Sequence, residues 1–203
     1  MTVRGAAFPT TNGQHPIVKI AAPPVSHSPS IEYRALPNGD GATFMTLDAM
    51  RDAVLGRIGP DYSGFDDPHN IRAARSICAG TSGQDETAQI AALFNWVITN
   101  ITYEPHPINQ QTLQDARRTL ELRKADCVSL SVLLATLLAC CGYQSRFIAQ
   151  WVDGESASHV YCEVLMPNGE WLALDAVAKD QPVGWRQKTL DGGFEVAWEI
   201  FNG

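Results

Sequence analysis

The sequence predicts an α+β protein in which helices come first and an antiparallel sheet follows. Up to residue 142 the apolar residues recur with the helical period, and beyond it they alternate with the period of two that is typical of strands. The 203 residues are enough for one hydrophobic core, and no internal repeat divides them. Helices and strands in separate blocks are the arrangement of α+β folds.

Three helices are expected before residue 100, each opened by a side chain that can cap its first backbone N–H groups. Gly-Pro at 59–60 ends the first helix, and Gly80 ends the second. In the third helix Asp85 lies three residues after the cap and resembles the second half of a capping box. The expected caps and spans are Thr46 for 46–58, Asp67 for 68–79 with Pro68 in the first helical position, and Ser82 for a helix that runs through residue 97.

A short extended segment at 101–103 and a helix at 112–123 follow. The next helix begins at or just after Cys127 and ends at Gly142, because glycine readily takes the left-handed conformation that ends helices. Its sequence from 128 to 141, VSLSVLLATLLACC, is apolar on every side. That run is too short and too rich in Ser and Thr to span a membrane, and it fits a helix buried on all sides.

Three strands are expected at 143–152, 158–166 and 170–177, with a further strand through 194–198. On the second strand His159 lies on the face opposite Val160, and on the third strand Asp175 shares the face of His159 only if the connecting turn has an odd number of residues. We therefore predict a three-residue turn, Pro167-Asn168-Gly169, with Gly169 in the left-handed region and forming a bulge.

Residues 1–40 hold six of the twelve prolines and are expected to form an extended arm with one or two edge strands, ahead of a compact domain at 41–203. A loosely ordered tail is the alternative reading of this composition.

Composition argues against several classes of function. The net charge is −7 and no basic stripe is present, which disfavours nucleic-acid binding. The five cysteines lack metal-ligand spacing, so no metal and no cofactor are expected, and their odd number favours a reduced, cytoplasmic location. The N-terminus lacks the apolar core of a signal peptide, and we expect no membrane association.

Three residues form a candidate nucleophilic site. Cys127 at a helix N-terminus is near unpaired N–H groups, which favour a thiolate and can stabilise an oxyanion. His159 would take the thiol proton, and Asp175 would orient the imidazole and stabilise its charged form. Taken singly, each has a plainer reading: Cys127 as a buried apolar residue, His159 as a surface histidine, and Asp175 as a turn residue.

The local sequences around these residues resemble the transglutaminase-like superfamily. The resemblance rests on four short motifs in order: Ala-Asp-Cys at 125–127, Gly-Tyr-Gln-Ser-Arg at 142–146, His-Val-Tyr-Cys-Glu at 159–163 and Trp-Leu-Ala-Leu-Asp at 171–175. Upstream, Trp96 and Tyr103 are similar to the family's lead-in. The resemblance implies a papain-like fold with Cys127, His159 and Asp175 as the catalytic triad. The sequence of residues 158–164 is also similar to that of transglutaminase-like proteins encoded by tailed bacteriophages and prophages, which would allow a virion-associated location.

The sequence departs from the family pattern at two places. Ala125 replaces the usual glycine, and Val128-Ser129 replace acidic residues. A side-chain oxyanion donor has no clear position, and Gln110 and Gln111 are candidates by position alone, with a solvated loop glutamine as the alternative. Trp171 shares the face of His159 and is a candidate for lining the substrate cleft.

The resemblance implies a thioester acyl-enzyme, and the group that resolves it defines the reaction. We expect water, which gives a thiol peptidase or amidase acting on a protein, peptide or other amide; an amine would give a transamidase. A second hypothesis is a non-catalytic binding or assembly module, with the proline-rich arm adding a strand to a protein partner. The substrate and the oligomeric state cannot be read from the sequence.

Overall fold

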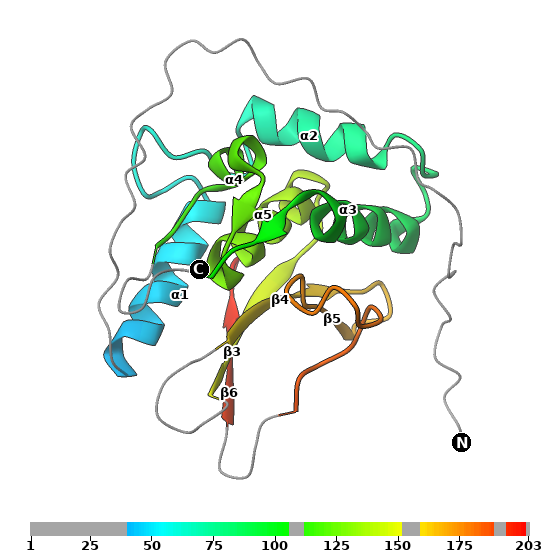
Figure 1. Cartoon of the computed structure of the whole chain (residues 1–203). Helices are drawn as coiled ribbons and strands as arrows, with labels where there is room; N and C mark the ends of the chain where they lie inside the picture. Colours follow the sequence, from blue (N-terminus) through cyan, green and yellow to red (C-terminus); the bar gives the residue numbers. More distant parts are fainter. Residues whose placement is uncertain (1–39, 106–111, 152–158, 189–193, 202–203) are drawn as a thin grey trace, which may run out of the picture.

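The computed structural model describes residues 40–105, 112–151, 159–188 and 194–201 (Figure 1). The described helices all precede the four-stranded sheet along the chain, as predicted, while two short strands lie between helices. The elements are α1 (Asp40–Val54), α2 (Pro68–Cys78), α3 (Glu86–Asn100), β1 (Thr102–Tyr103), α4 (Ala116–Leu122), β2 (Lys124–Ala125), α5 (Cys127–Cys140), β3 (Ser145–Trp151), β4 (His159–Leu165), β5 (Trp171–Leu174) and β6 (Phe194–Glu199). The expected arm at 1–40 lies outside the described residues, apart from Asp40 at the start of α1.

Strands β3 to β6 form one antiparallel sheet in the order β5-β4-β3-β6. The strand expected at the C-terminus is β6, which pairs with β3 at one edge of the sheet. Helix α5 packs on one face of this sheet through contacts with β3 and β4, and α1 to α4 surround its other sides (Figure 1). The sheet and the outer helices therefore form two layers with α5 between them.

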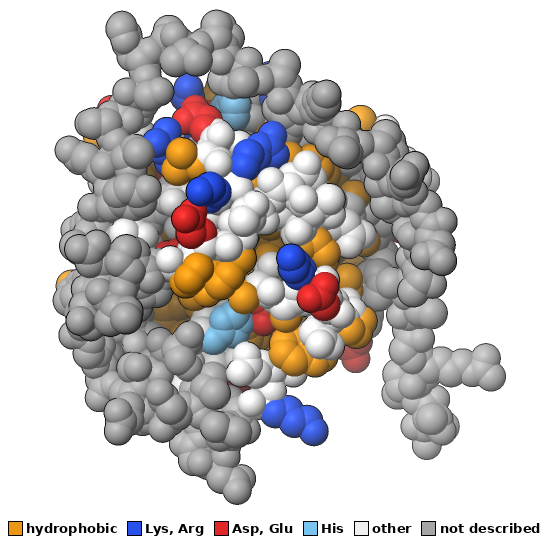
Figure 2. Space-filling model, viewed as in Figure 1, with side chains coloured by type: hydrophobic (Ala, Val, Ile, Leu, Met, Phe, Trp, Pro, Cys, Tyr) orange, Lys and Arg blue, Asp and Glu red, His pale blue; other side chains and the backbone are white. Residues whose placement is uncertain are grey.

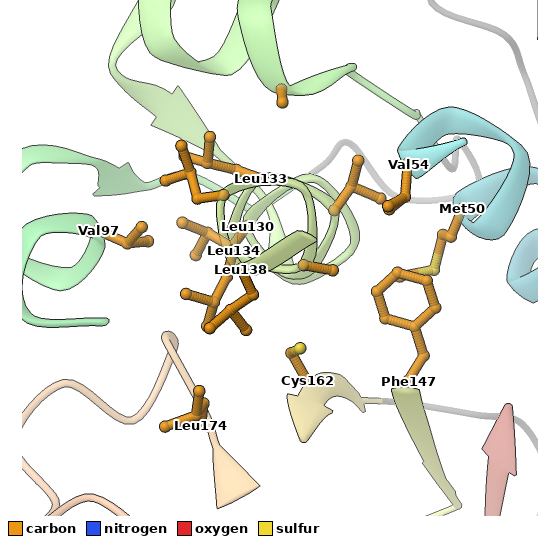
Figure 3. Packing of buried hydrophobic residues seen from close by; sticks show 14 of the residues in the cluster. Met50, Val54, Val97, Leu130, Leu133, Leu134, Leu138, Phe147, Cys162 and Leu174 are labelled. Atoms are coloured by element: carbon orange, nitrogen blue, oxygen red, sulfur yellow. The ribbon is translucent and has the colours of Figure 1, made fainter. Parts of the chain in front are cut away.

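Burial on every side explains the apolar sequence of α5. Eleven of its residues, 128–138, are buried, and Figure 3 shows Leu130, Leu133, Leu134 and Leu138 among core residues of α1, α3 and the sheet. Met50 and Val54 of α1 contribute to the same core from one side, and β3 to β5 close it from below. Fully burying one leucine stabilises a fold by about 1.5–3 kcal/mol, so the tertiary contacts of α5 exceed its intrinsic helix propensity.

Aspartates cap four of the helices, and three of the expected helix starts are wrong: those of α1 and α3, and that of α4, which begins after Asp115 rather than at residue 112. The capping side chains are Asp67 for α2, Asp85 for α3, Asp115 for α4 and Asp126 for α5. Helix α3 begins after Asp85 rather than at Ser82, because Gly83 favours a turn in which the Asp85 N–H donates to the Ser82 carbonyl at 3.0 Å. Helix α1 begins at Asp40 rather than after Thr46, since no proline between them interrupts it.

The turn between β4 and β5 has the predicted three residues. The Met166 N–H donates to the Glu170 carbonyl and the Gly169 N–H to the Met166 carbonyl, both at 2.8 Å, and Gly169 has φ +82°. The register pairs Cys162 with Leu174, and extending it by one residue sets Asp175 opposite Tyr161. The odd turn therefore puts Asp175 on the sheet face of His159, as the sequence predicts.

The sheet face turned away from α5 carries a buried carboxylate. Glu163 has no exposed surface and forms ion pairs with Arg146 at 2.7 Å and with Arg186 at 2.6 Å, and it accepts a hydrogen bond from Arg146 Nε at 2.9 Å. The Arg146 guanidinium also stacks on the ring of Trp171, 4.2 Å from its centroid. Because Arg186 lies in the segment after β5, this network fixes that segment against the sheet.

Candidate active site

The first turn of α5 determines the position of Cys127. The Asp126 carboxylate accepts a hydrogen bond from the Ser129 N–H at 2.7 Å and so caps the helix. The Ser131 hydroxyl is 2.8 Å from the Cys127 carbonyl oxygen and 3.3 Å from that of Val160, so it links this turn to β4. The thiol therefore lies next to the start of the strand that carries His159.

A short parallel pairing brings the chain to this point. The Thr102 N–H donates to the Arg123 carbonyl at 2.8 Å and the Glu104 N–H to the Ala125 carbonyl at 2.9 Å. Arg123 has a left-handed φ of +58°, which ends α4 and turns the chain toward α5. Strand β2 was not expected from the sequence, and its pairing places Tyr103 beside the residues that precede Cys127.

His159 and Asp175 form a hydrogen-bonded pair. The His159 Nε2 lies 2.7 Å from the Asp175 Oδ2, and the two side chains are 12% and 5% exposed. The other carboxylate oxygen of Asp175 accepts from the backbone N–H groups of Val177 and Ala178, at 3.0 and 3.4 Å. An Nε2–H that donates to Asp175 leaves Nδ1 of a neutral imidazole as an acceptor, which is the nitrogen that a base needs.

The structure pairs His159 with Asp175 but, within its described residues, gives no hydrogen bond between the Cys127 thiol and the His159 ring. Backbone N–H groups of Val160, Val128 and Cys127 itself lie near the sulfur and favour its ionised form. Val160 directly follows His159, so the thiol and the imidazole belong to adjacent parts of one site.

The environment of Cys127 opposes ionisation at rest, contrary to the expectation from its helix N-terminus. Burial, followed by the negative charge of Asp126, raises the pKa of the thiol to about 12. The nearby N–H groups lower it, but by less than these two effects raise it. The helix N-terminus was visible in the sequence, whereas the depth of burial depends on packing that no local pattern reveals.

Two tyrosines flank the site. Partial burial raises the pKa of Tyr103, and Cys127 when ionised, Asp126 and Asp175 raise it further, so the phenol is close enough to feel their charge although the residue is 43% exposed. The ring of Tyr161 stacks beside His159 with centroids 5.9 Å apart. The family resemblance is the only sequence signal for Tyr103, because the two-residue strands β1 and β2 that position it are too short to show a period.

Three other residues were considered from the sequence: Gln110, Gln111 and Trp171. Gln110 and Gln111 lie outside the described residues. Trp171 is on the face of His159, but it lies four residues before Asp175, roughly 13 Å along an extended strand. There it packs against Arg146.

Neither a metal-binding cluster nor a membrane-spanning helix is present in the described parts of the chain. No three His, Cys, Asp or Glu side chains there are grouped so that they could hold an ion. None of the helices there combines the length and apolarity needed to cross a bilayer. Figure 2 shows one face of the molecule with basic and acidic side chains interspersed and a histidine beside hydrophobic groups near its middle.

Comparison with known proteins identifies the family. The sequence profile of the transglutaminase-like superfamily matches residues 73–176, about half of the chain, including Cys127, His159 and Asp175. No curated protein matches the sequence.

Two solved structures are similar at low identity. One is a candidate protease from Parabacteroides distasonis, 15% identical, with a TM-score of 0.49 over 66% of this chain and 26% of that one. The other is a candidate cysteine protease from Cytophaga hutchinsonii, 13% identical, with a TM-score of 0.44 over 64% of this chain and 47% of that one. The chain thus spans about a quarter and about half of their lengths. With its profile match and its α+β architecture, the chain belongs to the transglutaminase-like superfamily.

Proposed function

We propose that this protein is a cysteine-dependent acyl-transfer enzyme, a thiol peptidase or amidase in which Cys127 is the nucleophile, His159 the base and Asp175 the residue that orients the base. The observation that supports this most directly is the 2.7 Å hydrogen bond between His159 and Asp175, next to the N-terminus of the helix that begins with Cys127. An oriented imidazole beside a thiol is the arrangement that nucleophilic catalysis needs.

In the proposed reaction the Cys127 sulfur attacks the carbonyl carbon of an amide while its proton passes to Nδ1 of His159. Backbone N–H groups in the first turn of α5 are suited to stabilise the resulting oxyanion. The imidazolium then protonates the leaving amine, and the C–N bond breaks to give a thioester. His159 next deprotonates a water that attacks the thioester, which releases the acid and restores the thiol. Asp175 stabilises the imidazolium in both halves of the cycle.

The raised pKa of Cys127 bears on how the first step proceeds. A thiol that is protonated at rest must lose its proton as it attacks, so the base contributes directly to the barrier. The thiol and the imidazole are not hydrogen bonded in the resting structure, and we infer that one of the two side chains rotates when substrate binds.

Hydrolysis and transamidation share the thioester and differ only in the group that attacks it. Hydrolysis requires no acceptor site beyond access for water, and it is our first choice. The product decides between them: free acid from an amide substrate supports the hydrolase, whereas an adduct that dominates when a primary amine is present supports the transamidase.

An exposed apolar surface favours a second candidate function, that of a binding or assembly module. Phe44 and Met45 of α1 and Phe201 after β6 are 43%, 57% and 39% exposed. Phe44 also packs against Trp198 of β6, with ring centroids 5.8 Å apart. Strand β6 pairs on one side only within the described sheet, so a partner strand could extend it next to these aromatic residues.

The two functions are separated by labelling with a set of peptidyl vinyl sulfones, which react with cysteine nucleophiles that a base assists. We expect labelling at Cys127 that falls by about 10²–10⁴-fold in His159→Ala, the range typical of a general base. Asp175→Asn should also reduce the rate, because its amide oxygen still accepts the Val177 and Ala178 N–H groups but its neutral side chain no longer stabilises the imidazolium.

Cys140→Ser is the matched control, since Cys140 lies on the same helix but its thiol points at the Phe65 carbonyl, 3.1 Å away. It should label at the wild-type rate. Equal labelling rates in wild type and His159→Ala, with both proteins shown to be folded by circular dichroism, would contradict the enzymatic proposal and favour the binding module.

A further inference from the structure

Two cysteines outside the candidate active site have their sulfur atoms in contact. Cys78 is the last residue of α2, and Cys141 is the residue that ends α5. Their Sγ atoms are 4.0 Å apart, although 63 positions separate them in the sequence. Cys127 begins the same helix that Cys141 ends, and 14 helical residues put about 21 Å between the two ends. The pair is therefore a separate site.

The other three cysteines have different surroundings. Cys162 is fully buried in the core, and the Cys140 thiol points to the Phe65 carbonyl on another side of α5. Cys78 and Cys141 are both partly exposed, which gives a small reagent access to them; Cys127 and Cys140 are partly exposed too, so the contact between the two sulfurs is what sets the pair apart. Within the described residues they form the only hydrogen bond between two cysteine sulfurs.

The two thiols are not equivalent. The hydrogen bond between the two sulfurs lowers the pKa of Cys141, burial opposes this effect, and the positive charge of Arg75 adds to the lowering. The same hydrogen bond, followed by burial, raises the pKa of Cys78. Cys141 is therefore the sulfur that ionises first and attacks an oxidant, and Cys78 is placed to resolve the product.

We propose that Cys78 and Cys141 form a redox-active dithiol that closes to an intramolecular disulfide by exchange with a small-molecule disulfide. The Cys141 thiolate attacks one sulfur of the reagent, the reagent S–S bond breaks, and one thiolate leaves. The Cys78 sulfur then loses its proton and attacks the Cys141 sulfur of the mixed disulfide, which releases the second thiol. Two protein thiols are oxidised, and one small disulfide is reduced to two thiols.

The ends of both helices provide room for this reaction. The sulfur atoms must approach from 4.0 Å to the S–S bond length of about 2.05 Å. Cys78 is followed by a turn with Gly80, where an added side chain would meet nothing within 4 Å. Cys141 is followed by Gly142 at φ +87°, and the Tyr143 N–H donates to the Leu138 carbonyl to close the helix end. Small shifts in these turns can bring the sulfurs together without moving the core.

The test treats the full chain with excess oxidised glutathione, quenches with acid, and alkylates the remaining thiols for intact-mass analysis. Wild type has five cysteines and should retain three alkylated thiols with no glutathione attached. Cys78→Ser should stop at one glutathione adduct on Cys141, because the resolving thiol is missing. Cys141→Ser should form no disulfide and should keep its thiols free.

Cys140→Ser is the matched control, since it removes the neighbouring sulfur and should still lose two thiols. The variants are needed to locate the disulfide, because trypsin leaves Cys127, Cys140 and Cys141 on one peptide, 125–146, and digestion alone cannot tell them apart. The disulfide should also raise the midpoint of thermal unfolding, because it joins positions 63 apart and limits the unfolded chain. Five free thiols in oxidised wild type, a link that survives Cys141→Ser, or a link between two molecules would overturn the proposal.

Discussion

Replacing Asp126 with Asn should make the Cys127 thiol react faster, because the substitution removes a negative charge that opposes ionisation of the thiol. The Asp126 carboxylate is the second cause, after burial, of the raised thiol pKa of about 12. Asparagine keeps an oxygen that can accept the Ser129 N–H, so the helix cap is retained. The substitution therefore changes the electrostatics of the thiol with little change to the fold.

The magnitude follows from two opposing effects. At pH 8 the ionised fraction of a thiol of pKa about 12 is about 10⁻⁴, whereas the ionised fraction of an ordinary cysteine of pKa about 8.5 is about 0.2. The more basic thiolate is intrinsically more nucleophilic, by a factor of about 25–55 over this interval. Cys127 should therefore alkylate roughly 50- to 100-fold more slowly than a free thiol at pH 8. Each unit by which Asp126→Asn lowers the pKa should raise the rate about threefold.

The assay is the rate of iodoacetamide labelling at Cys127 between pH 7 and 10, located by mass spectrometry. Because this range lies below the raised pKa, the wild-type rate should rise about tenfold per pH unit with no plateau. Asp85→Asn is the matched control, since it alters the equivalent cap of α3 and should leave the labelling unchanged. A plateau below pH 9 in wild type, or slower labelling in Asp126→Asn, would refute the reasoning and would instead indicate a resident thiolate paired with His159.

Three further predictions concern stability and are measured by urea unfolding. Glu163→Ala should lower the free energy of unfolding by about 3 kcal/mol, because it removes a fully buried carboxylate that lies 2.7 Å from Arg146 and 2.6 Å from Arg186. Arg186 contributes less, because it is the more exposed of the two. Gly64→Ala should lower the free energy of unfolding by about 1–3 kcal/mol or more, because the added Cβ would lie 2.4–2.9 Å from backbone atoms of a neighbouring turn. Gly80→Ala should leave the free energy of unfolding unchanged, because its Cβ would meet nothing within 4 Å. Asp85→Ala should cost about 1 kcal/mol, and Ser82→Ala much less.

Each of these predictions has its own contrary result. Equal unfolding midpoints for the two glycine variants would show that the close approach at Gly64 relaxes freely. A larger loss from Ser82→Ala than from Asp85→Ala would place the start of α3 where the sequence first suggested it. Unchanged stability in Glu163→Ala would mean that its arginines find other partners.

The sequence predicted best those features that depend on strong periodicity or on turn geometry. The burial of α5 followed from its uninterrupted apolar run, and its start at Cys127 is as expected. The turn at 167–169 followed from the alternation on two strands, and Gly169 has the positive φ that the argument required. In both cases several residues jointly favour one arrangement.

Features that depend on distant contacts could not be predicted in this way. Strand β2 has two residues, too few for any period, and only its pairing with β1 defines it. The position of Tyr103 follows from that pairing. The pKa of Cys127 could not be obtained from the helix N-terminus alone, because burial by the surrounding elements has the larger effect.

The position of α5 in the middle of the fold has a consequence for synthesis on the ribosome. The helices that cover it are made first, but the strands that cover its remaining face, from β3 onward, follow it in the chain. Until about residue 175 has emerged, one side of this largely apolar helix has nothing to pack against. A nascent or truncated chain that stops after Cys141 should therefore be a substrate for chaperones, and should aggregate without them. The same helix that makes the finished core compact is the one that makes the unfinished chain vulnerable.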